Sequence, residues 1–497
     1  MKTHAASWLG AAKRLADAQV DGASIVAFRV IFGLFGILVV ARFFAHGWIG
    51  PLYVEPDHHF AYLGFGWVQP WPGWGMHAHF IALGALSLGI AIGYRPRLCA
   101  ALFCIGFTYV ELLDRTTYLN HHYLMSLVSL LLAILPLRRG TVPLWTIWAL
   151  RAQVGIVYVF AGIAKLNPDW LFHALPMRIW LYQHGDLPLL GPLLQELWVA
   201  YAMSWGGAMF DLAIVPALLW PRTRVPAYCT LVAFHLATWV LFPQLGIFPW
   251  LMIGLTLIFF EPDWPRRLFA LRLRHSTIRI PSFLCSREST TSLQHEALDS
   301  GFRRNDEVRS RNDEVRSRND KTGRYDKTGR SWRAHALLIA LMLFAVVQLA
   351  LPLRHYAYPG NVRWDEEGYL FAWRVMLTEK VGYVRYRVRE PATGQSWLVE
   401  PDEYLTPLQV ERMSFQPDMI RQTAHIIATD FSERGYTDVV VNADAFVAFN
   451  GRPNTRLIAP DVDLASVRPG LAPKTWVLPY KPDAAAGRNQ TGAVRPY

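Results

Sequence analysis

IVAFRVIFGLFGILVVARFFA, residues 25–45, is an apolar run of 21 residues broken only by two arginines. Since a helix needs about 20 apolar residues to cross the hydrocarbon core of a bilayer, this run predicts a transmembrane helix. Further apolar runs follow, and several are so short that their helices must tilt or pack inside a bundle. They lie at 77–94, 98–113, 122–137, 147–164, 206–220, 226–241, 246–260 and 334–352.

The composition supports a membrane protein. The chain is 53% hydrophobic and 18% charged, whereas soluble proteins are about a quarter charged. Many of its 20 Trp and 27 Phe residues stand near the ends of apolar runs, as in the aromatic belts at membrane interfaces. The net charge of +11 is concentrated in one segment, which favours the lipid bilayer over nucleic acid as the partner.

The positions of arginine predict the topology. Alternate loops contain arginines, and because cytoplasmic loops are rich in Lys and Arg, these loops are expected to be cytoplasmic. The intervening loops carry almost no positive charge: residues 46–76 and 242–245 contain no arginine or lysine, and residues 114–121 contain only Arg115. The N-terminus is therefore expected in the cytoplasm and the region after the last span outside it. The arginine pairs are Arg95 and Arg97, Arg138 and Arg139, Arg222 and Arg224, and Arg266 and Arg267.

Composition also divides the chain. We expect a transmembrane domain at 1–262, a disordered basic linker at 263–332, a final transmembrane helix at 333–352 and a soluble α/β domain at 353–497. The linker contains the tandem repeats RRNDEVR (303–309) and SRNDEVR (310–316), followed by two copies of DKTGR. Such charged repeats cannot bury a core. They are either a cytoplasmic tether to anionic lipid or an insertion without a role.

The soluble domain shows both strand and helix patterns. Tyr383 to Val388 alternates as a strand does, and residues 407–434 have helical spacing. Residues 438–449 and 456–459 predict two strands around a turn at Asn450-Gly451. The expected fold class is thus a membrane all-α bundle of about eight or nine transmembrane helices with a C-terminal soluble α/β domain.

Polar residues at membrane depth are costly and therefore usually have a function or a partner. Four positions stand out: the segment Asp114–His122, the segment AGIAKLNPDW at 161–170, His235 and Asp211. Each has a structural alternative. Asp114 and Arg115 could be an interfacial ion pair, and His121 and His122 could be interface histidines in a short loop. Lys165 could snorkel to the headgroups, His235 could donate to a carbonyl, and Asp211 could pair with another helix.

The chemical interpretation starts from Lys165. A lysine in a low dielectric loses its proton more readily and can act as a base, while nearby Asn120 and His121 could hold an anionic oxygen. These three residues are expected at one membrane face, where a lipid-soluble substrate would arrive from the bilayer. The sequence has no nucleotide loop, no metal-ligand spacing and no nucleophile elbow.

Four segments carry a resemblance to a known family. The chain resembles the vitamin K-dependent gamma-glutamyl carboxylases and their bacterial relatives with the horizontally transferred transmembrane (HTTM) domain, over about residues 20–262 and 333–480. The segments are LLDRTTYLNHHYLMSL (112–127), VPLWTIWALRAQVGIVYVFAGIAKLNPDWL (142–171), VAFHLATW (232–239) and YLFAWRVM (369–376).

The resemblance implies a peptidyl-glutamate 4-carboxylase. Such an enzyme couples the oxidation of reduced vitamin K, a hydroquinone, by O2 to the carboxylation of glutamate side chains by CO2. The quinone leaves as an epoxide. By the resemblance, Lys165 deprotonates the hydroquinone, Asn120 and His121 lie beside it, and His235 is the histidine of a family motif. Tyr369 and Trp373 match the start of the family's lumenal domain, which helps to bind the glutamate-containing peptide.

The sequence departs from the family at two places. Thr238 stands where the family often has an asparagine three residues after the matched histidine, and Ala164 stands where a second lysine can occur. Two alternative functions therefore remain open. One is a membrane enzyme that acts on a different quinone or lipid without carboxylation, and the other is a non-enzymatic transporter or membrane scaffold.

Overall fold

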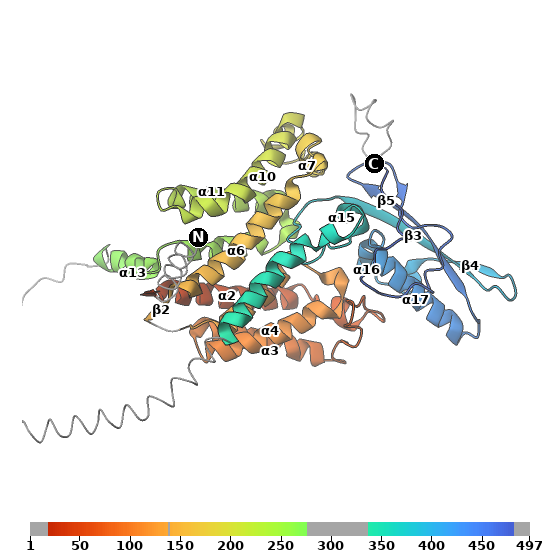
Figure 1. The fold of residues 1–497 in the computed structure, drawn as a ribbon, viewed down its shortest axis with the longest axis horizontal. Coiled ribbons are helices and arrows are strands. Elements are labelled where there is room, and N and C mark those ends of the chain that lie inside the picture. The colour runs from red at the N-terminus through yellow and green to blue at the C-terminus, as the bar shows by residue number, and fades with distance from the viewer. Residues whose placement is uncertain (1–17, 138–139, 276–335, 482–497) are drawn as a thin grey trace, which may run out of the picture. The chain divides into compact units, whose positions relative to one another are not determined.

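The computed structural model describes residues 18–137, 140–275 and 336–481 of the chain (Figure 1). Within these ranges the chain forms two compact units. The larger contains residues up to Pro265 together with those from Leu351 onward, and the smaller runs from Arg266 to Ala350. The repeats at 303–330 lie outside the described residues.

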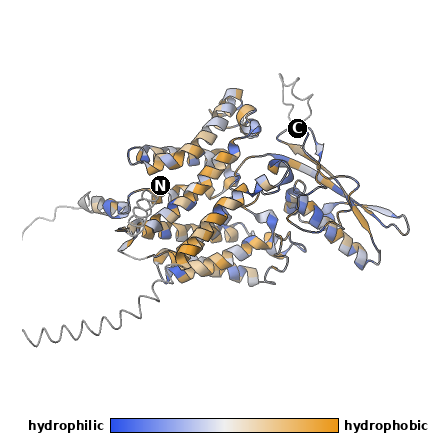
Figure 2. Cartoon of the chain, in the orientation of Figure 1, coloured by the Kyte–Doolittle hydropathy of each residue, from blue (hydrophilic) through white to orange (hydrophobic). Residues whose placement is uncertain are grey.

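The described chain is mostly helical, and each of the predicted apolar runs overlaps a helix. Seven helices are long and apolar enough to cross a membrane: α2 (Ala23–Ala45), α3 (Gly75–Ile92), α4 (Pro96–Leu113), α6 (Leu144–Lys165), α10 (Leu197–Leu219), α11 (Arg224–Leu241) and the helix Ala336–Ala357. Two shorter apolar helices lie at α5 (Asn120–Ile134) and at α12 with η4 (Phe248–Phe259). Figure 2 shows the apolar residues spread over these helices.

Two differences from the sequence prediction stand out. Helix α10 begins at Leu197, nine residues before the predicted run, because Leu197, Trp198 and Val199 are themselves apolar and extend the helix. Residues Trp264–His275, expected as disordered linker, form helix α13. Pro265 is pre-organised for a first helical turn and the Leu, Ala and Arg residues that follow favour helix.

The bundle is built from neighbouring helix pairs, with α2 packed on α3, α4 on α5 and α6 on α10. Small residues allow the close approaches. A Cβ atom at Gly33 of α2 would lie 2.6 Å from the backbone nitrogen of Ala91 in α3. The short connecting elements are η1 (Gly50–Val54), η2 (Arg115–Thr117), α7 (Pro168–Phe172), α8 (Met177–Tyr182), α9 (Gly191–Leu194) and η3 (Pro243–Leu245).

At one end of the bundle the N-terminal segment meets two later loops. Strand β1 (Gln19–Asp21) pairs with β2 (Thr141–Pro143), and Ser24 donates a backbone hydrogen bond to Pro262. Arg224 forms an ion pair with Glu261 at the same end. The chain start, the loop before α6 and the end of η4 therefore lie together.

The C-terminal domain is a four-stranded antiparallel sheet in the order β4-β3-β5-β6, with helices α16 and α17 beside it (Figure 1). Alternate side chains of β3 and β5 and one face of α17 share one core with Trp364. The elements are η5 (Arg354–Ala357), α15 (Val362–Asp365), β3 (Lys380–Arg389), β4 (Ser396–Val399), η6 (Pro401–Glu403), α16 (Pro407–Met413), α17 (Pro417–Glu433), β5 (Val440–Phe449) and β6 (Thr455–Arg456).

The mixed strand and helix pattern predicted for this domain is confirmed, with two corrections. The strand predicted at 456–459 is shorter and begins earlier, as β6 (Thr455–Arg456), with a single further bridge at Ile458. Residues 407–434 form two helices instead of one, because Pro417 cannot continue the first helix and begins the second. The predicted turn is present, with positive φ at Asn450 and Gly451. Strand β4, which pairs with β3, was not predicted from the sequence.

The close contact at Gly33 leads to a stability prediction. Gly33→Ala should lower the melting temperature in detergent, because its new methyl group overlaps the α3 backbone, at a cost of about 1–3 kcal/mol. The matched control is Gly206→Ala in α10, where a Cβ atom meets nothing within 4 Å. This control should be neutral or slightly stabilising, since alanine favours helix. Equal melting temperatures for the two variants would contradict the packing described.

Candidate active site

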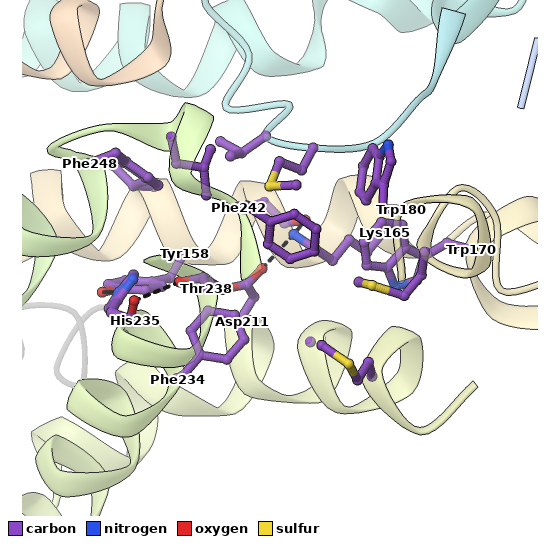
Figure 3. Close-up of a pocket in the computed structure, with 18 residues that line it drawn as sticks. Tyr158, Lys165, Trp170, Trp180, Asp211, Phe234, His235, Thr238, Phe242 and Phe248 are labelled. Carbon is purple, nitrogen blue, oxygen red and sulfur yellow. Dashed lines mark hydrogen bonds and ion pairs between the residues drawn. The ribbon is translucent and has the colours of Figure 1, made fainter. Parts of the chain in front are cut away.

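A cavity lies between α6, α10, α11 and the start of the C-terminal region (Figure 3). It contains about 770 Å³ not filled by atoms, part of it open to the surroundings. Most of its walls are apolar or aromatic. The lining residues are Val157, Tyr158, Ala161, Lys165, Trp170, Met177, Trp180, Met203, Gly207, Asp211, Phe234, His235, Thr238, Phe242, Leu245, Phe248, Val375 and Met376.

The strongest polar contact in this cavity joins Lys165 to Asp211. The Lys165 Nζ atom lies 2.7 Å from Asp211 Oδ2, and the two side chains are only 9% and 7% exposed. Figure 3 shows them pointing toward one another from α6 and α10. Nζ also lies 5.4 Å from the ring centre of Trp170. Lys165 therefore does not reach toward the headgroups, as the snorkelling alternative requires.

The contact between Lys165 and Asp211 bears on what the sequence led us to expect for both residues. Asp211 pairs with another helix, as one alternative held, but its partner is the proposed base itself. A nearby carboxylate favours the charged form of an amine, whereas burial disfavours it. The isolated lysine expected from the sequence is therefore replaced by an ion pair whose net charge is zero.

A second polar pair also lines the cavity. His235 Nε2 lies 2.8 Å from the Tyr158 hydroxyl. This ring nitrogen therefore pairs with a side chain, whereas the structural alternative had His235 donate to a carbonyl. The Thr238 hydroxyl donates to the His235 carbonyl at 2.9 Å, within its own helix. Tyr158 was missed in the sequence, although it stands two helical turns before Lys165 and thus on the same face of α6.

Asn120 and His121 do not line the cavity but contact residues at its wall. Asn120 Nδ2 donates to the Arg374 carbonyl at 3.3 Å, and Arg374 directly precedes two lining residues. The His121 ring centre lies 6.1 Å from that of Phe248, whose ring lines the cavity and lies 6.4 Å from His235. The sequence placed both residues beside Lys165, whereas the described contacts connect them to the site through one intervening residue.

Tyr369 and Trp373, which the resemblance assigns to peptide binding, contact other residues of the protein in this structure. Trp373 is fully buried and stacks on Tyr123 of α5, with ring centres 5.0 Å apart. Tyr369 lies under the Arg374 guanidinium and does not line the cavity. The residues of this segment that do reach the cavity are Val375 and Met376, which the sequence did not single out.

Asp169, in the same motif as Lys165, fastens the C-terminal domain to the bundle. Its carboxylate forms ion pairs with Arg452 at 2.5 Å and Arg363 at 3.1 Å, and accepts a hydrogen bond from Asn450 at 2.9 Å. Burial alone would raise the pKa of Asp169. The hydrogen bond and charge of Arg452, with smaller contributions from Arg363 and Asn450, lower this pKa below its usual 3.8.

The contacts of Asp169 continue to the cavity wall. Asn450 accepts from the backbone of Glu379, whose carboxylate accepts from Trp180 Nε1 at 2.6 Å. Trp180 lines the cavity, and so does Trp170, the residue after Asp169. The docking of the domain and the shape of the cavity thus depend on the same side chains.

Among the described residues, no group of three or more His, Cys, Asp or Glu side chains is arranged to hold a metal ion. Among the lining residues, the main polar groups are the Lys165–Asp211 pair, the His235–Tyr158 pair and the Thr238 hydroxyl. This set suits a mostly apolar molecule with oxygen atoms at its edges.

Two family models match the chain. Residues 18–264 match the HTTM domain, and residues 333–483 match the vitamin K-dependent gamma-carboxylase lumenal domain. The first match covers the bundle that contains Lys165, Asp211 and His235, and the second covers the domain fastened to Asp169. No solved structure matches the chain.

The Asp169 cluster leads to a second stability prediction. Asp169→Asn should lower the free energy of unfolding by about 3–5 kcal/mol at pH 7, because it leaves two largely buried arginines without a counter-charge. The control Asp444→Asn removes a more exposed carboxylate that pairs with Arg387 and Arg456, and should cost less than about 1 kcal/mol. Thermal unfolding in detergent measures both. Equal losses would contradict a special role of Asp169.

The lowered pKa of Asp169 gives this contribution a pH dependence. A carboxyl whose pKa is lower in the folded protein stabilises it above the unfolded value and loses this effect as pH falls toward the folded value. The difference in melting temperature between the native chain and Asp169→Asn should therefore be constant near neutrality and shrink below about pH 4. A difference that grows on acidification would contradict the assignment.

Proposed function

The chain belongs to the vitamin K-dependent gamma-carboxylase family, and from this premise we propose that it carboxylates protein glutamate residues with CO2 while oxidising a reduced vitamin K-type quinone with O2. The observation that carries the proposal is the buried Lys165 at the wall of an apolar cavity. The cavity lies in the part of the chain that matches the HTTM domain, and the lumenal-type domain contributes Val375 and Met376 to it.

The cavity fits a reduced naphthoquinone by its chemistry. Aromatic walls from Phe234, Phe242 and Phe248 suit a flat apolar ring, and the two polar pairs suit its two oxygens. When bound, the hydroquinone supplies with O2 the strong base that removes a γ-hydrogen from glutamate, and it ends as an epoxide. The mostly apolar walls lower the local dielectric, which strengthens the polar contacts inside.

Within this proposal each polar side chain has a role. Lys165 Nζ takes the proton of one quinol hydroxyl, and His235 with Tyr158 holds the other oxygen by a hydrogen bond. Asn120 and His121 belong to the quinol site as positioning residues. Asn120 holds the Arg374 carbonyl before the lining residues, and His121 packs against Phe248.

The glutamate-containing peptide is proposed to reach the cavity from the C-terminal domain. Trp373 and Tyr369 serve it indirectly, since they anchor the segment that ends in Val375 and Met376. A direct contact of Trp373 with the peptide would first require this buried ring to leave its place against Tyr123.

The proposed setting is a multi-pass integral membrane protein with nine crossings, an odd number that puts the N-terminus and the C-terminal domain on opposite sides. The N-terminus and the basic linker would be cytoplasmic and the C-terminal domain periplasmic or lumenal. The domain binds loops at Asp114 and Asp169, through Gln409 at 3.0 Å and Arg452. The arginine-bearing loop at Arg224 joins the opposite helix ends, which supports this orientation.

One observation favours a second candidate, a quinol oxidase of the same family that does not carboxylate. Thr238 replaces a family asparagine, and its hydroxyl is bonded to the His235 carbonyl of its own helix. The cavity could thus keep the lysine chemistry of quinol oxidation while losing a group that acts on O2 or CO2.

A single incubation tests the proposal. Purified protein with reduced vitamin K, labelled CO2 and a glutamate-containing peptide should form epoxide and labelled γ-carboxyglutamate together. Lys165→Ala should lower both rates by about 10²–10⁴-fold, as expected for loss of a general base. The control Lys481→Ala alters an exposed lysine outside the cavity and should leave them unchanged.

The outcomes separate the candidates. Quinol oxidation without labelled peptide would support the second candidate and contradict carboxylation. Full activity of Lys165→Ala would contradict the role of this lysine. A native chain that is inert toward both substrates, under conditions where a known carboxylase works, would contradict the proposed function as a whole.

A further inference from the structure

We propose that Asp211 holds the proton that Lys165 must release before it can act as a base, so that the base of the site is the Lys165–Asp211 pair. This inference rests on the proposed function and deepens it. It starts from the 2.7 Å contact between Nζ and Oδ2 and from the burial of both side chains.

The pair stands apart from other charges in the cavity. Tyr158 on α6 and His235 on α11 are the other titratable groups among the described lining residues, and they are bonded to one another. The Trp170 ring also faces Nζ, with its centre 5.4 Å away. Nζ has one further contact, the Ala161 carbonyl at 3.4 Å. Asp211 is therefore the group in the cavity that can take a proton from Lys165 directly.

The geometry solves a chemical problem posed by the ion pair. An ammonium group has no lone pair and cannot accept the proton of a quinol hydroxyl. If one proton first moves from Nζ to Asp211 Oδ2 along the existing hydrogen bond, both groups become neutral. Nζ can then accept the hydroxyl proton.

The proton transfers balance without any electron transfer. The pair starts with net charge zero and ends with charge +1, as ammonium and protonated carboxyl, while the quinol oxygen gains charge −1. The low dielectric of the cavity brings the neutral and ionic forms of the pair closer in free energy, because both charges of the ionic form lack water.

A purely structural role for Asp211 is the alternative. Helices α6 and α10 approach closely at Gly162, where a Cβ atom would lie 2.8 Å from the Leu212 side chain, so an ion pair could simply tie them together. Both roles predict that removal of Asp211 destabilises the protein. Both roles also predict a change in the reactivity of the Lys165 amine, because its counter-charge is lost in either case. They differ in turnover, which a structural tie lowers only through the loss of stability.

The first test measures that amine without any quinone. The full-length protein in detergent is treated with a small acylating reagent over a range of pH, and acylation of Lys165 is followed by peptide mass spectrometry, since only the neutral amine reacts. In Asp211→Asn the amine lacks its counter-charge, and half-maximal acylation should move to lower pH by at least about one unit. The control Asp444→Asn should leave it unchanged.

An unchanged midpoint in Asp211→Asn would overturn the proposal, even if this variant were less stable. So would a Lys165 that stays unreactive at every pH in both proteins, because the cavity would then be closed to small molecules. If Asp211→Asn does not fold, Asp211→Glu replaces it. With a carboxyl kept and only its position altered, the midpoint should stay within about half a unit of the native one.

The second test uses turnover. Quinol oxidation should fall by about 10²-fold in Asp211→Asn and by less than about 10-fold in Asp211→Glu, which keeps a proton acceptor. Equal losses in both would contradict proton holding and support a structural tie. If the native chain shows no carboxylation but the acylation midpoint still shifts, the proposed substrate is wrong while the Lys165–Asp211 assignment stands.

Discussion

The structure depends on one contact, the ion pair between Lys165 and Asp211 inside an apolar bundle. A charge in such surroundings is tolerated only with a partner, and the loss of either partner leaves the other exposed to a low dielectric. The pair therefore connects α6 to α10, and in our proposal it also holds the proton that Lys165 must release. Its neutral total charge explains how a lysine can lie within a cavity whose walls are mostly apolar.

The second constraint is the attachment of the C-terminal domain beside that pair. Asp169, four residues after Lys165, binds the side chains of Arg363, Arg452 and Asn450 from the domain. Through Glu379 the same contacts reach Trp180 at the cavity wall. Because the cavity is completed by Val375 and Met376, the domain that would receive a peptide also shapes the place where a quinol would bind.

Much of the fold could be predicted because its signal is local. Each apolar run became a helix, and the strand patterns at 383–388 and 438–449 became β3 and β5. The break at Pro417 was present in the sequence and was missed in favour of helical spacing on both sides of it. The start of the linker was taken as disordered because of its charge, although its first residues favour helix.

The site was harder to predict than the fold, because the sequence does not give the distances between helices. Lys165 was found, but its pairing with Asp211 depends on how α6 and α10 pack. Asn120 and His121 stand one residue away from the cavity because Arg374 and Phe248 intervene. Trp373 was expected to face a peptide and is instead buried against Tyr123.

The most direct measurement for the central claim is photo-crosslinking of a naphthoquinone with a photoreactive ring, mapped by mass spectrometry. The account predicts that the label attaches to cavity residues such as Phe234, Phe242 or Met376, and that reduced vitamin K prevents it. Label confined to other parts of the bundle, with the cavity unmodified, would contradict the account.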